Sequence, residues 1–358
     1  MSNYVTTRIA NRTGILTLDR PKALNSLSLE MVRELTRVLM AWQVDAAIDA
    51  VVLTSSSEKA LCAGGDIRFF HECGHATPMG GSALLEDFFT EEYALNHLIH
   101  FYPKPYIALM DGVVMGGGMG IAQGGPGCGL RIVTERSKVA MPEVNIGLFP
   151  DVGGSHFLSR APGQLGNYLG LTGLTIGAAD ALYVDLADVF VPGEQMAALH
   201  ALIEARPGAE LPAAIKGFAA AFTPPAGALA AERERIDRHF GQPTVAAVMA
   251  SLEGDDSAFA QKALAAMRTR SPLMMCVTRE LLVRGAALDV AGCLRMERTL
   301  VRHNFEHGEV LEGVRALVID KDNAPKWNPP ALEEVTEEMV NQFFTEVWPA
   351  HAHPLRHL

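Results

Sequence analysis

The chain has 358 residues, of which 49% are hydrophobic and 7% aromatic, as expected for a globular protein with one large domain and an appendage. Its formal net charge of -11 argues against nucleic acid or an anionic membrane surface as a partner, because both repel an acidic protein. Five widely spaced cysteines without a CxxC pair indicate neither a disulfide framework nor a zinc site, so we expect no bound metal and mostly buried thiols.

The N-terminal sequence bears on where the protein works. Residues 1–21 pass almost directly into strand-like sequence and resemble neither a signal peptide nor a transit peptide. No apolar run reaches the roughly 20 residues that a membrane-spanning helix needs. We therefore expect a cytoplasmic protein.

The first half of the chain alternates strand and helix patterns. β-branched apolar runs at residues 14–19 and 50–56 predict strands, and apolar side chains recur at helical spacing between Leu29 and Leu39. The pattern returns with a strand at 105–112, a helix through 116–125 and short strands within 129–143. Repeated units of this kind predict an α/β core with stacked strands.

The second half of the chain is predicted to be mainly helical. Helical patterns cover residues 163–173, 177–192 and 195–205. Within 217–236, an Ala/Pro-rich loop leads into the start of a charged helix. We place a soft boundary near residue 205, which separates a core at 1–205 from a helical region at 206–358. The final segment, HAHPLRHL, is predicted to be a disordered tail.

Two glycine-rich segments are candidates for a ligand site. ALCAGGDIRFF and DGVVMGGGMG both follow apolar strands, and their glycines allow the backbone to approach a ligand closely. One N–H group from each loop would suffice for an oxyanion hole, although a tight turn or close helix packing explains either loop alone. The sequence does not contain GxGxxG at this place, a GxxxxGK[ST] phosphate loop or a GxSxG elbow.

Several segments together resemble a known family. RPKALNSLS, ALCAGGDI, PYIALMDGVVMGGGMGI and MPEVNIGLFPDVGGS, in this order, resemble the crotonase (enoyl-CoA hydratase/isomerase) superfamily. FFTEEYALN, the Asp of GLFPDVGG and the C-terminal NFEHGEVLEGVRALVIDKDNAPKWNP resemble its 3-hydroxyisobutyryl-CoA hydrolase branch. The resemblance implies an α/β fold, a crotonase-like spiral of repeated ββα units with a mainly helical C-terminal region.

The resemblance also implies how an acyl-CoA substrate is held. The backbone N–H groups of Gly65 and Gly117 would hold the thioester oxygen. The candidate contacts to coenzyme A are Lys22, Ala23, Leu24, Ala63 and Asp66, the last two near the adenine. An ordinary solvated lysine is the alternative for Lys22. Coenzyme A is part of the substrate, and no separate cofactor is expected.

The acids depart from the hydratase pattern. Hydratases of this superfamily use two glutamates, and the first of these positions is Gly120 here, whereas the second is Glu143. Asp151 stands where hydratases typically carry glycine. We predict that Glu143 is the nucleophile or general base, and that Asp151 orients water or the substrate hydroxyl and tunes Glu143. Glu92 is a third candidate, for contact with the acyl end of the substrate.

Each acid has an alternative structural role. Glu143 would otherwise be a helix-start or surface acid, and Glu92 part of a solvated helix face. Asp151 would otherwise be the N-cap of a helix that begins near Gly153.

These residues together predict hydrolysis of a short branched 3-hydroxyacyl-CoA to the free acid and CoA. The resemblance implies 3-hydroxyisobutyryl-CoA and valine breakdown. An enoyl-CoA hydratase or isomerase and a non-catalytic acyl-CoA-binding protein are the alternatives. Superfamily relatives often form trimers through C-terminal helices, but the C-terminal sequence here differs, so whether the chain forms a homo-oligomer stays open.

Overall fold

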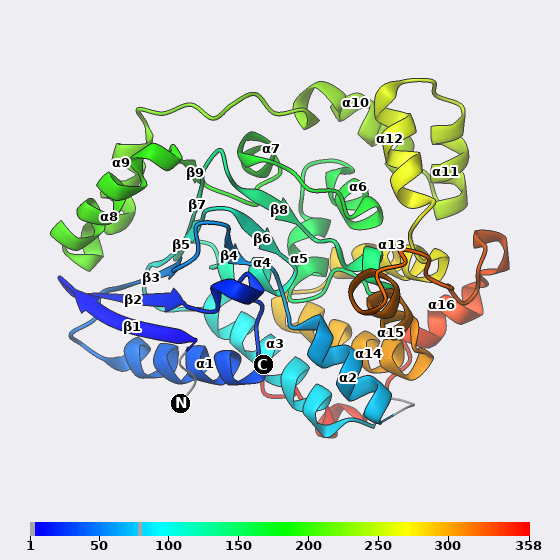
Figure 1. Ribbon diagram of the computed structural model, residues 1–358, viewed down its shortest axis with the longest axis horizontal. Helices are drawn as coiled ribbons and strands as arrows, with labels where there is room; N and C mark the ends of the chain where they lie inside the picture. Colours follow the sequence, from blue (N-terminus) through cyan, green and yellow to red (C-terminus); the bar gives the residue numbers. More distant parts are fainter. Residues whose placement is uncertain (1–3, 78–80) are drawn as a thin grey trace. The chain divides into compact units, whose positions relative to one another are not determined.

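The computed structural model describes residues 4–77 and 81–358 of the chain (Figure 1). These residues form two compact units. The first unit comprises Met1–Gly65, Ala94–Ala140 and Thr175–Ala230, and the second comprises Asp66–Tyr93, Met141–Leu174 and Ala231–Leu358. The division at residue 205 that the sequence suggests stays a prediction.

The first unit is built on two sheets. Its larger sheet has the order β1-β2-β3-β5-β7-β9 among the described residues. These strands are β1 (Val5–Ala10), β2 (Thr13–Leu18), β3 (Ala50–Ser55), β5 (Tyr106–Met110), β7 (Gly129–Val133) and β9 (Val189–Phe190). Only the pair β1–β2 is antiparallel within this part of the chain. The smaller, parallel sheet contains β4 (Ala60–Cys62), β6 (Val113–Met115) and β8 (Lys138–Ala140).

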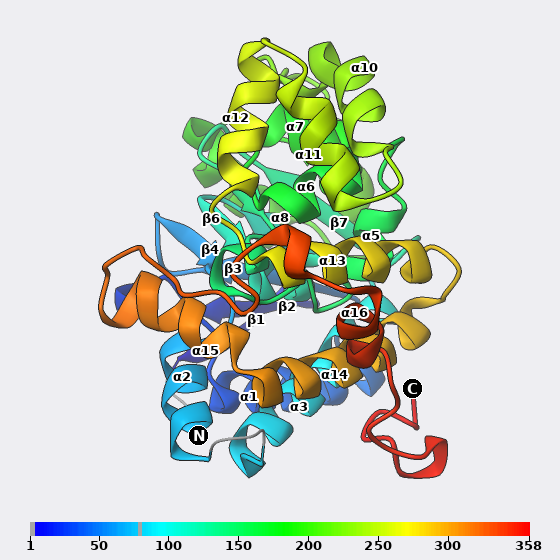
Figure 2. The same ribbon diagram turned by 90° about the vertical axis from the view of Figure 1, so that its right-hand side faces the viewer.

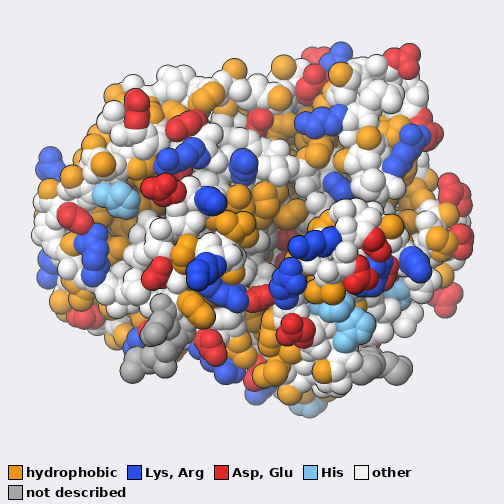
Figure 3. All heavy atoms as spheres, viewed as in Figure 1, with side chains coloured by type: hydrophobic (Ala, Val, Ile, Leu, Met, Phe, Trp, Pro, Cys, Tyr) orange, Lys and Arg blue, Asp and Glu red, His pale blue; other side chains and the backbone are white. Residues whose placement is uncertain are grey.

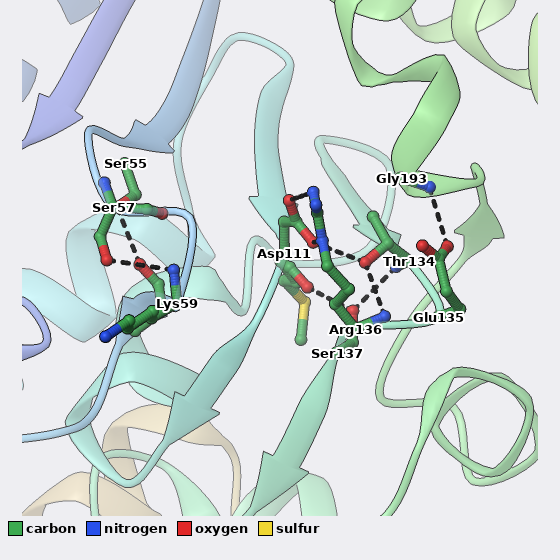
Figure 4. Close-up of polar contacts among 11 residues, drawn as sticks. Ser55, Ser57, Lys59, Asp111, Thr134, Glu135, Arg136, Ser137 and Gly193 are labelled. Carbon is green, nitrogen blue, oxygen red and sulfur yellow. Dashed lines mark hydrogen bonds and ion pairs between the residues drawn. The ribbon is translucent and has the colours of Figure 1, made fainter.

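The two sheets are linked by a repeated corner. In β3–β4, β5–β6 and β7–β8 the chain leaves the larger sheet, turns sharply and enters the smaller one. Polar side chains fix these turns, as Figure 4 shows: Thr134 Oγ1 donates to Asp111 at 2.6 Å, and Ser137 Oγ donates to the Met110 carbonyl at 2.5 Å. Helical segments follow the strand pairs, so the predicted crotonase-like spiral of ββα units is confirmed.

Helices cover the sheets of the first unit. The core between the larger sheet and α8 (Met196–Ala205) and α9 (Leu211–Ala219) includes Ile15, Val52, Ile107, Leu199 and Ile215. The predicted amphipathic helix is α1 (Leu29–Val44), which buries Leu35 and Leu39 and begins at a Ser28 cap. The unit also contains α4 (Gly117–Ala122) and α7 (Ala178–Tyr183).

The second unit is helical. Its elements before residue 175 are α2 (Ile67–Ala76), the first half of α3 (Ala83–His100), the short 3-10 helix η3 (Glu143–Ile146), α5 (Gly154–Ser159) and α6 (Leu165–Thr172). The C-terminal part supplies α10 (Leu229–Phe240), α11 (Val245–Glu253), α12 (Ala258–Met267), α13 (Pro272–Gly285), α14 (Val290–His307), α15 (Glu309–Val314) and α16 (Glu337–Phe343). The mainly helical C-terminal region is therefore confirmed. In Figures 1 and 2, α15 lies beside α2, and the two helices are in contact.

Two expectations about local structure were wrong. The predicted helix at 177–192 stops at Tyr183, because Val189 and Phe190 form β9 and pair with β7 instead. The predicted disordered tail is ordered: Leu355 is fully buried, and Arg295 Nη1 donates to the Leu358 carbonyl at 3.0 Å. Both segments gain more from burial against the rest of their unit than their local sequence indicates.

Three further features of the structure concern the surface charges, the start of the first strand and the length of the helices. Acidic and basic side chains both occur across the face in Figure 3. The N-terminal stretch enters a strand at Val5, and its first three residues lie outside the described ones. None of the helices in the described ranges is long and apolar enough to cross a membrane.

Candidate active site

The two glycine loops lie next to each other within the first unit. The loop after β4 contains Gly64 in a backbone conformation with φ +103°, which side-chain-bearing residues rarely adopt. A Cβ on Gly64 would lie 3.2 Å from the Met115 carbonyl and 3.6 Å from the Gly117 nitrogen. The two loops are therefore adjacent, as an oxyanion hole with one N–H group from each loop requires.

The candidate oxyanion donors remain available for a ligand. Gly117 is the first residue of α4, where N–H groups have no acceptor within the helix. Neither Gly65 nor Gly117 donates its backbone N–H to an acceptor elsewhere in residues 4–77 and 81–358. That these amides hold a thioester oxygen stays a prediction.

The candidate coenzyme A lip is attached to the first glycine loop. Ala63 N donates to the Leu24 carbonyl at 3.0 Å, and Leu27 N donates to the Gly64 carbonyl at 2.8 Å. Lys22 is exposed, in the short 3-10 helix η1 (Pro21–Ala23) that contains Ala23. The structure thus brings four of the five candidate coenzyme A contacts together, namely Lys22, Ala23, Leu24 and Ala63.

Asp66, the fifth candidate contact, has a structural role. Its side chain caps α2 and accepts a hydrogen bond from Phe69 N at 3.4 Å. A contact between Asp66 and adenine stays a prediction.

The three candidate acids are buried in the second unit. Glu92, Glu143 and Asp151 are 2%, 6% and 5% exposed. The alternatives of a solvated helix face for Glu92 and a surface acid for Glu143 are therefore wrong, although Glu143 does begin η3. Carboxylates are rarely buried without a partner, so this cluster needs a functional or electrostatic explanation.

Asp151 is held by a tyrosine. Its Oδ2 accepts a hydrogen bond of 2.6 Å from the hydroxyl of Tyr93, which is itself fully buried on α3. The alternative that Asp151 caps the following helix is wrong, because Gly153 occupies the N-cap of α5. The side chain of Asp151 is therefore turned toward α3.

Burial raises the pKa values of all three acids, and the charge of Asp151 raises those of the two glutamates further. Burial, followed by the negative charge of Asp151, raises the pKa of Glu92 and of Glu143 well above the ordinary glutamate value. Burial raises the pKa of Asp151 to about 6, although the Tyr93 hydrogen bond lowers it. A pKa of about 6 suits a group that exchanges protons near neutral pH.

Two oxygen atoms in this cluster have no hydrogen-bond partner within residues 4–77 and 81–358. Glu92 Oε1 and Glu143 Oε2 are buried, and neither forms a hydrogen bond with the residues that the structure describes. An unsatisfied buried carboxylate oxygen is unfavourable, so a water molecule or a substrate hydroxyl is expected to bind there. The cluster is arranged for a polar ligand.

The C-terminal helices hold the segment that carries Glu143. Asn304 Nδ2 on α14 donates to the Gly147 carbonyl at 2.9 Å. Gly147 lies so close to the backbone of Glu309 that a Cβ would overlap it, and Gly313 is equally close to the backbone of Ile146. Only glycine permits these approaches.

Sequence reasoning missed two residues of this site. Tyr93 follows Glu92 directly in the segment TEEYALN, so its position next to a candidate acid was the available signal. Glu297 on α14 is fully buried and binds the backbone after Asp151, across a separation of 144 residues from Gly153. No local pattern signals a contact of that range.

No three His, Cys, Asp or Glu side chains among the described residues are placed to hold a metal ion.

Comparison with known proteins defines the class. The family model described as enoyl-CoA hydratase/isomerase matches residues 13–344, and the chain belongs to that family. Its curated relatives include proteins named "3-hydroxyisobutyryl-CoA hydrolase, mitochondrial". The one from Xenopus tropicalis is 40% identical over 94% of this chain and 88% of the relative. The one from Homo sapiens is 36% identical over 93% of this chain and 86% of the relative.

Two solved structures are also similar. The structure of a carnitinyl-CoA dehydratase from Mycobacterium thermoresistibile has a TM-score of 0.90 and 39% identity, covering 97% of this chain and 98% of that one. The structure of an enoyl-CoA hydratase from Rhodobacter sphaeroides 2.4.1 has a TM-score of 0.86 and 38% identity, and the match covers 96% of this chain and 98% of that one. Both titles name a CoA compound, carnitinyl-CoA in one and enoyl-CoA in the other.

Proposed function

We propose that the protein hydrolyses 3-hydroxyisobutyryl-CoA, a short branched 3-hydroxyacyl-CoA thioester, to the free acid and CoA. The curated relatives that bear this activity in their names match the chain over most of both lengths. The observation that carries the proposal is the buried acid cluster, in which Glu92 and Glu143 each keep an oxygen without a partner in the described part of the chain. The raised pKa of Glu143 makes it a stronger base than an exposed glutamate.

Two balanced routes are open to Glu143. As a general base it takes a proton from water while the water oxygen attacks the thioester carbon; the C–S bond then breaks, and the proton passes to the CoA thiolate. As a nucleophile its carboxylate attacks the same carbon and expels the thiolate. Water then cleaves the resulting anhydride, which releases the free acid and regenerates the Glu143 carboxylate, and the remaining proton passes to the thiolate. In either route the amides of Gly65 and Gly117 would stabilise the oxyanion. Asp151 would orient the water or the substrate hydroxyl.

Enoyl-CoA hydration is the second candidate. The titles of the two similar solved structures name a hydratase and a dehydratase, which favours this reaction. Hydration across a double bond uses an acid and a base on either side of it, and in this superfamily the first glutamate lies where this chain has Gly120. A glycine there supplies no proton, so we favour hydrolysis.

The deciding experiment compares both reactions with one preparation. Free CoA release from 3-hydroxyisobutyryl-CoA is measured with a thiol reagent, and hydration of crotonyl-CoA is followed in parallel. Hydrolysis without efficient hydration is expected. Efficient hydration without thiol release would overturn the proposal, and tight binding with neither reaction would favour a non-catalytic acyl-CoA-binding protein.

A variant links the activity to the acid cluster. Glu143→Gln is expected to reduce turnover by about a hundredfold or more, because the base or nucleophile is lost. Glu253→Gln changes a half-exposed glutamate paired with Arg268 and serves as the matched control with unchanged turnover. Full activity in Glu143→Gln would remove Glu143 from the mechanism.

The setting of the reaction is part of the proposal. The substrate implies a place in valine breakdown, and we keep a cytoplasmic location, whereas the curated relatives carry "mitochondrial" in their names. Cell fractionation with an antibody to the chain tests the location. Light scattering during gel filtration tests whether a homo-oligomer forms.

A further inference from the structure

Glu297 is a fully buried carboxylate in the middle of α14, far from the candidate acids in sequence. Both of its oxygens accept hydrogen bonds. Oε2 accepts from Gly153 N at 2.8 Å, and Oε1 accepts from Ser155 N at 3.0 Å and from Ser155 Oγ at 2.5 Å. Three donors on one carboxylate make a strong, directional attachment to the start of α5.

The attachment satisfies a helix end that lacks an ordinary cap. Gly153 occupies the N-cap position of α5 and forms no side-chain cap hydrogen bond. The first N–H groups of a helix need an acceptor when they are buried. Glu297 supplies that acceptor from α14, so the start of α5 depends on a side chain of the C-terminal region.

The residue between Asp151 and this helix end is strained. Val152 has φ +53°, in the left-handed region that a β-branched residue adopts rarely and only at a cost in free energy. Such a conformation persists only where the surroundings determine it. Here the Glu297 hydrogen bonds fix the residue after Val152, and the Tyr93 hydroxyl fixes Asp151 before it.

We propose that Glu297 is a positioning residue for Asp151: it holds the Gly153–Ser155 backbone, and thereby keeps the strained Val152 turn that points Asp151 toward Tyr93. This inference rests on the proposed hydrolase function, because Asp151 has a catalytic role only there. Glu297 has no role of its own in bond breaking and acts through the geometry of the turn.

The charge of Glu297 gives the inference a measurable signature. Burial, and to a smaller extent the charge of Asp151, raise the pKa of Glu297 to about 8, so its carboxyl is mostly ionised only above that pH. Burial and the charge of Asp151 raise the pKa of the nearby Glu143, and the ionised Glu297 raises it further. The charged and titratable groups around this cluster include Glu92 and Tyr93 from α3, Glu143 and Asp151 from the segment before α5, and Cys293 and Arg298 from α14. Removing the negative charge of Glu297 should therefore lower the pKa of Glu143.

The test is Glu297→Gln, assayed for thiol release from 3-hydroxyisobutyryl-CoA. The amide retains the shape but offers one acceptor oxygen instead of two, so it loses at least one hydrogen bond to the backbone. We expect kcat to fall by about 10- to 100-fold with KM within about threefold, because a misplaced catalytic group affects the reaction more than binding. The acidic limb of the pH profile of kcat/KM should move to lower pH.

The controls separate positioning from mere destabilisation. Glu280→Gln changes a surface glutamate paired with Arg284 on α13 and should leave kcat and the pH profile unchanged. Ser155→Ala removes only the hydroxyl donor and keeps both backbone donors, so it should reduce kcat by a smaller factor. If Glu297→Gln does not fold, Ser155→Ala becomes the deciding variant.

The outcomes are distinguishable from failure of the proposed function. If the unmodified protein releases no thiol, hydrolysis itself is wrong. If the unmodified protein is active and folded Glu297→Gln has the same kcat and the same acidic limb, the positioning role is wrong. If Glu297→Gln does not fold, an unchanged kcat in Ser155→Ala shows that the positioning role is wrong.

Discussion

Removing the Tyr93 hydroxyl tests the hydrogen bond that holds Asp151. The Tyr93 hydroxyl donates a hydrogen bond of 2.6 Å to the Asp151 carboxylate. The pKa of this carboxylate in the folded protein is about 6, above the ordinary value of 3.8. A hydrogen bond to a neutral group contributes about 0.5–1.5 kcal/mol to stability, and one to a charged group about 1.5–3 kcal/mol. Tyr93→Phe should therefore lower the free energy of unfolding by the smaller amount at pH 5 and by the larger amount at pH 8.

The direction of this pH dependence follows from linkage. Because the folded pKa of Asp151 is raised, its contribution to stability is present below about pH 3.8 and is lost as the pH rises through about 6. Without the Tyr93 donor the pKa of Asp151 in the folded protein rises further. The loss of stability with rising pH then becomes larger and extends to higher pH.

Urea unfolding at pH 5 and pH 8 measures the effect. Tyr102→Phe is a matched control, because the buried Tyr102 hydroxyl donates to the neutral Leu39 carbonyl at 2.9 Å. Tyr102→Phe should lower the free energy of unfolding by the same amount at both pH values. An equal loss for Tyr93→Phe at pH 5 and pH 8, or none at either, would refute the view that this bond stabilises an ionised Asp151.

Three further predictions concern the lip, the glycine loop and the acids. Lys22→Ala should raise KM about two- to fivefold with kcat unchanged, since an exposed charge contributes up to about 1 kcal/mol equally before and during reaction; steady-state kinetics checks this. Gly64→Ala should lower the free energy of unfolding by about 1–3 kcal/mol, because the φ of Gly64 is +103°. Gly177→Ala should not lower it, because no described atom lies within 4 Å of the position that the new Cβ would take, and urea unfolding compares the two variants. Asp151→Asn should lower kcat and move the acidic limb of the pH profile to lower pH, because a negative charge beside Glu143 is removed; an unmoved limb would contradict the coupling.

The strands and the glycine loops could be predicted from the sequence because their signals are local. The β-branched runs that became β2 and β3 alternate with helical spacing in α1, and each is visible within a short window. β9 was missed because two residues carry too little pattern, and its pairing with β7 decides its conformation. Local propensity is overridden there by tertiary contact.

The acid cluster was predicted in part. Glu92, Glu143 and Asp151 were found from ordered motifs, and their burial agrees with a functional role. The direction of the Asp151 side chain was not predictable, because the N-cap role that its position suggests is taken by Gly153. Glu297 was out of reach, since a contact across 144 residues depends on the fold as a whole.

The distance along the chain between α5 and its acceptor sets an order of assembly during synthesis. Gly153 leaves the ribosome 144 residues before Glu297, which corresponds to roughly 7–30 s of translation at about 5–20 residues per second. During that interval the nascent chain already contains Glu92, Glu143 and Asp151 but has no partner for the start of α5. A premature stop before residue 297 would therefore release a chain with the complete acid set and no competent turn at Val152.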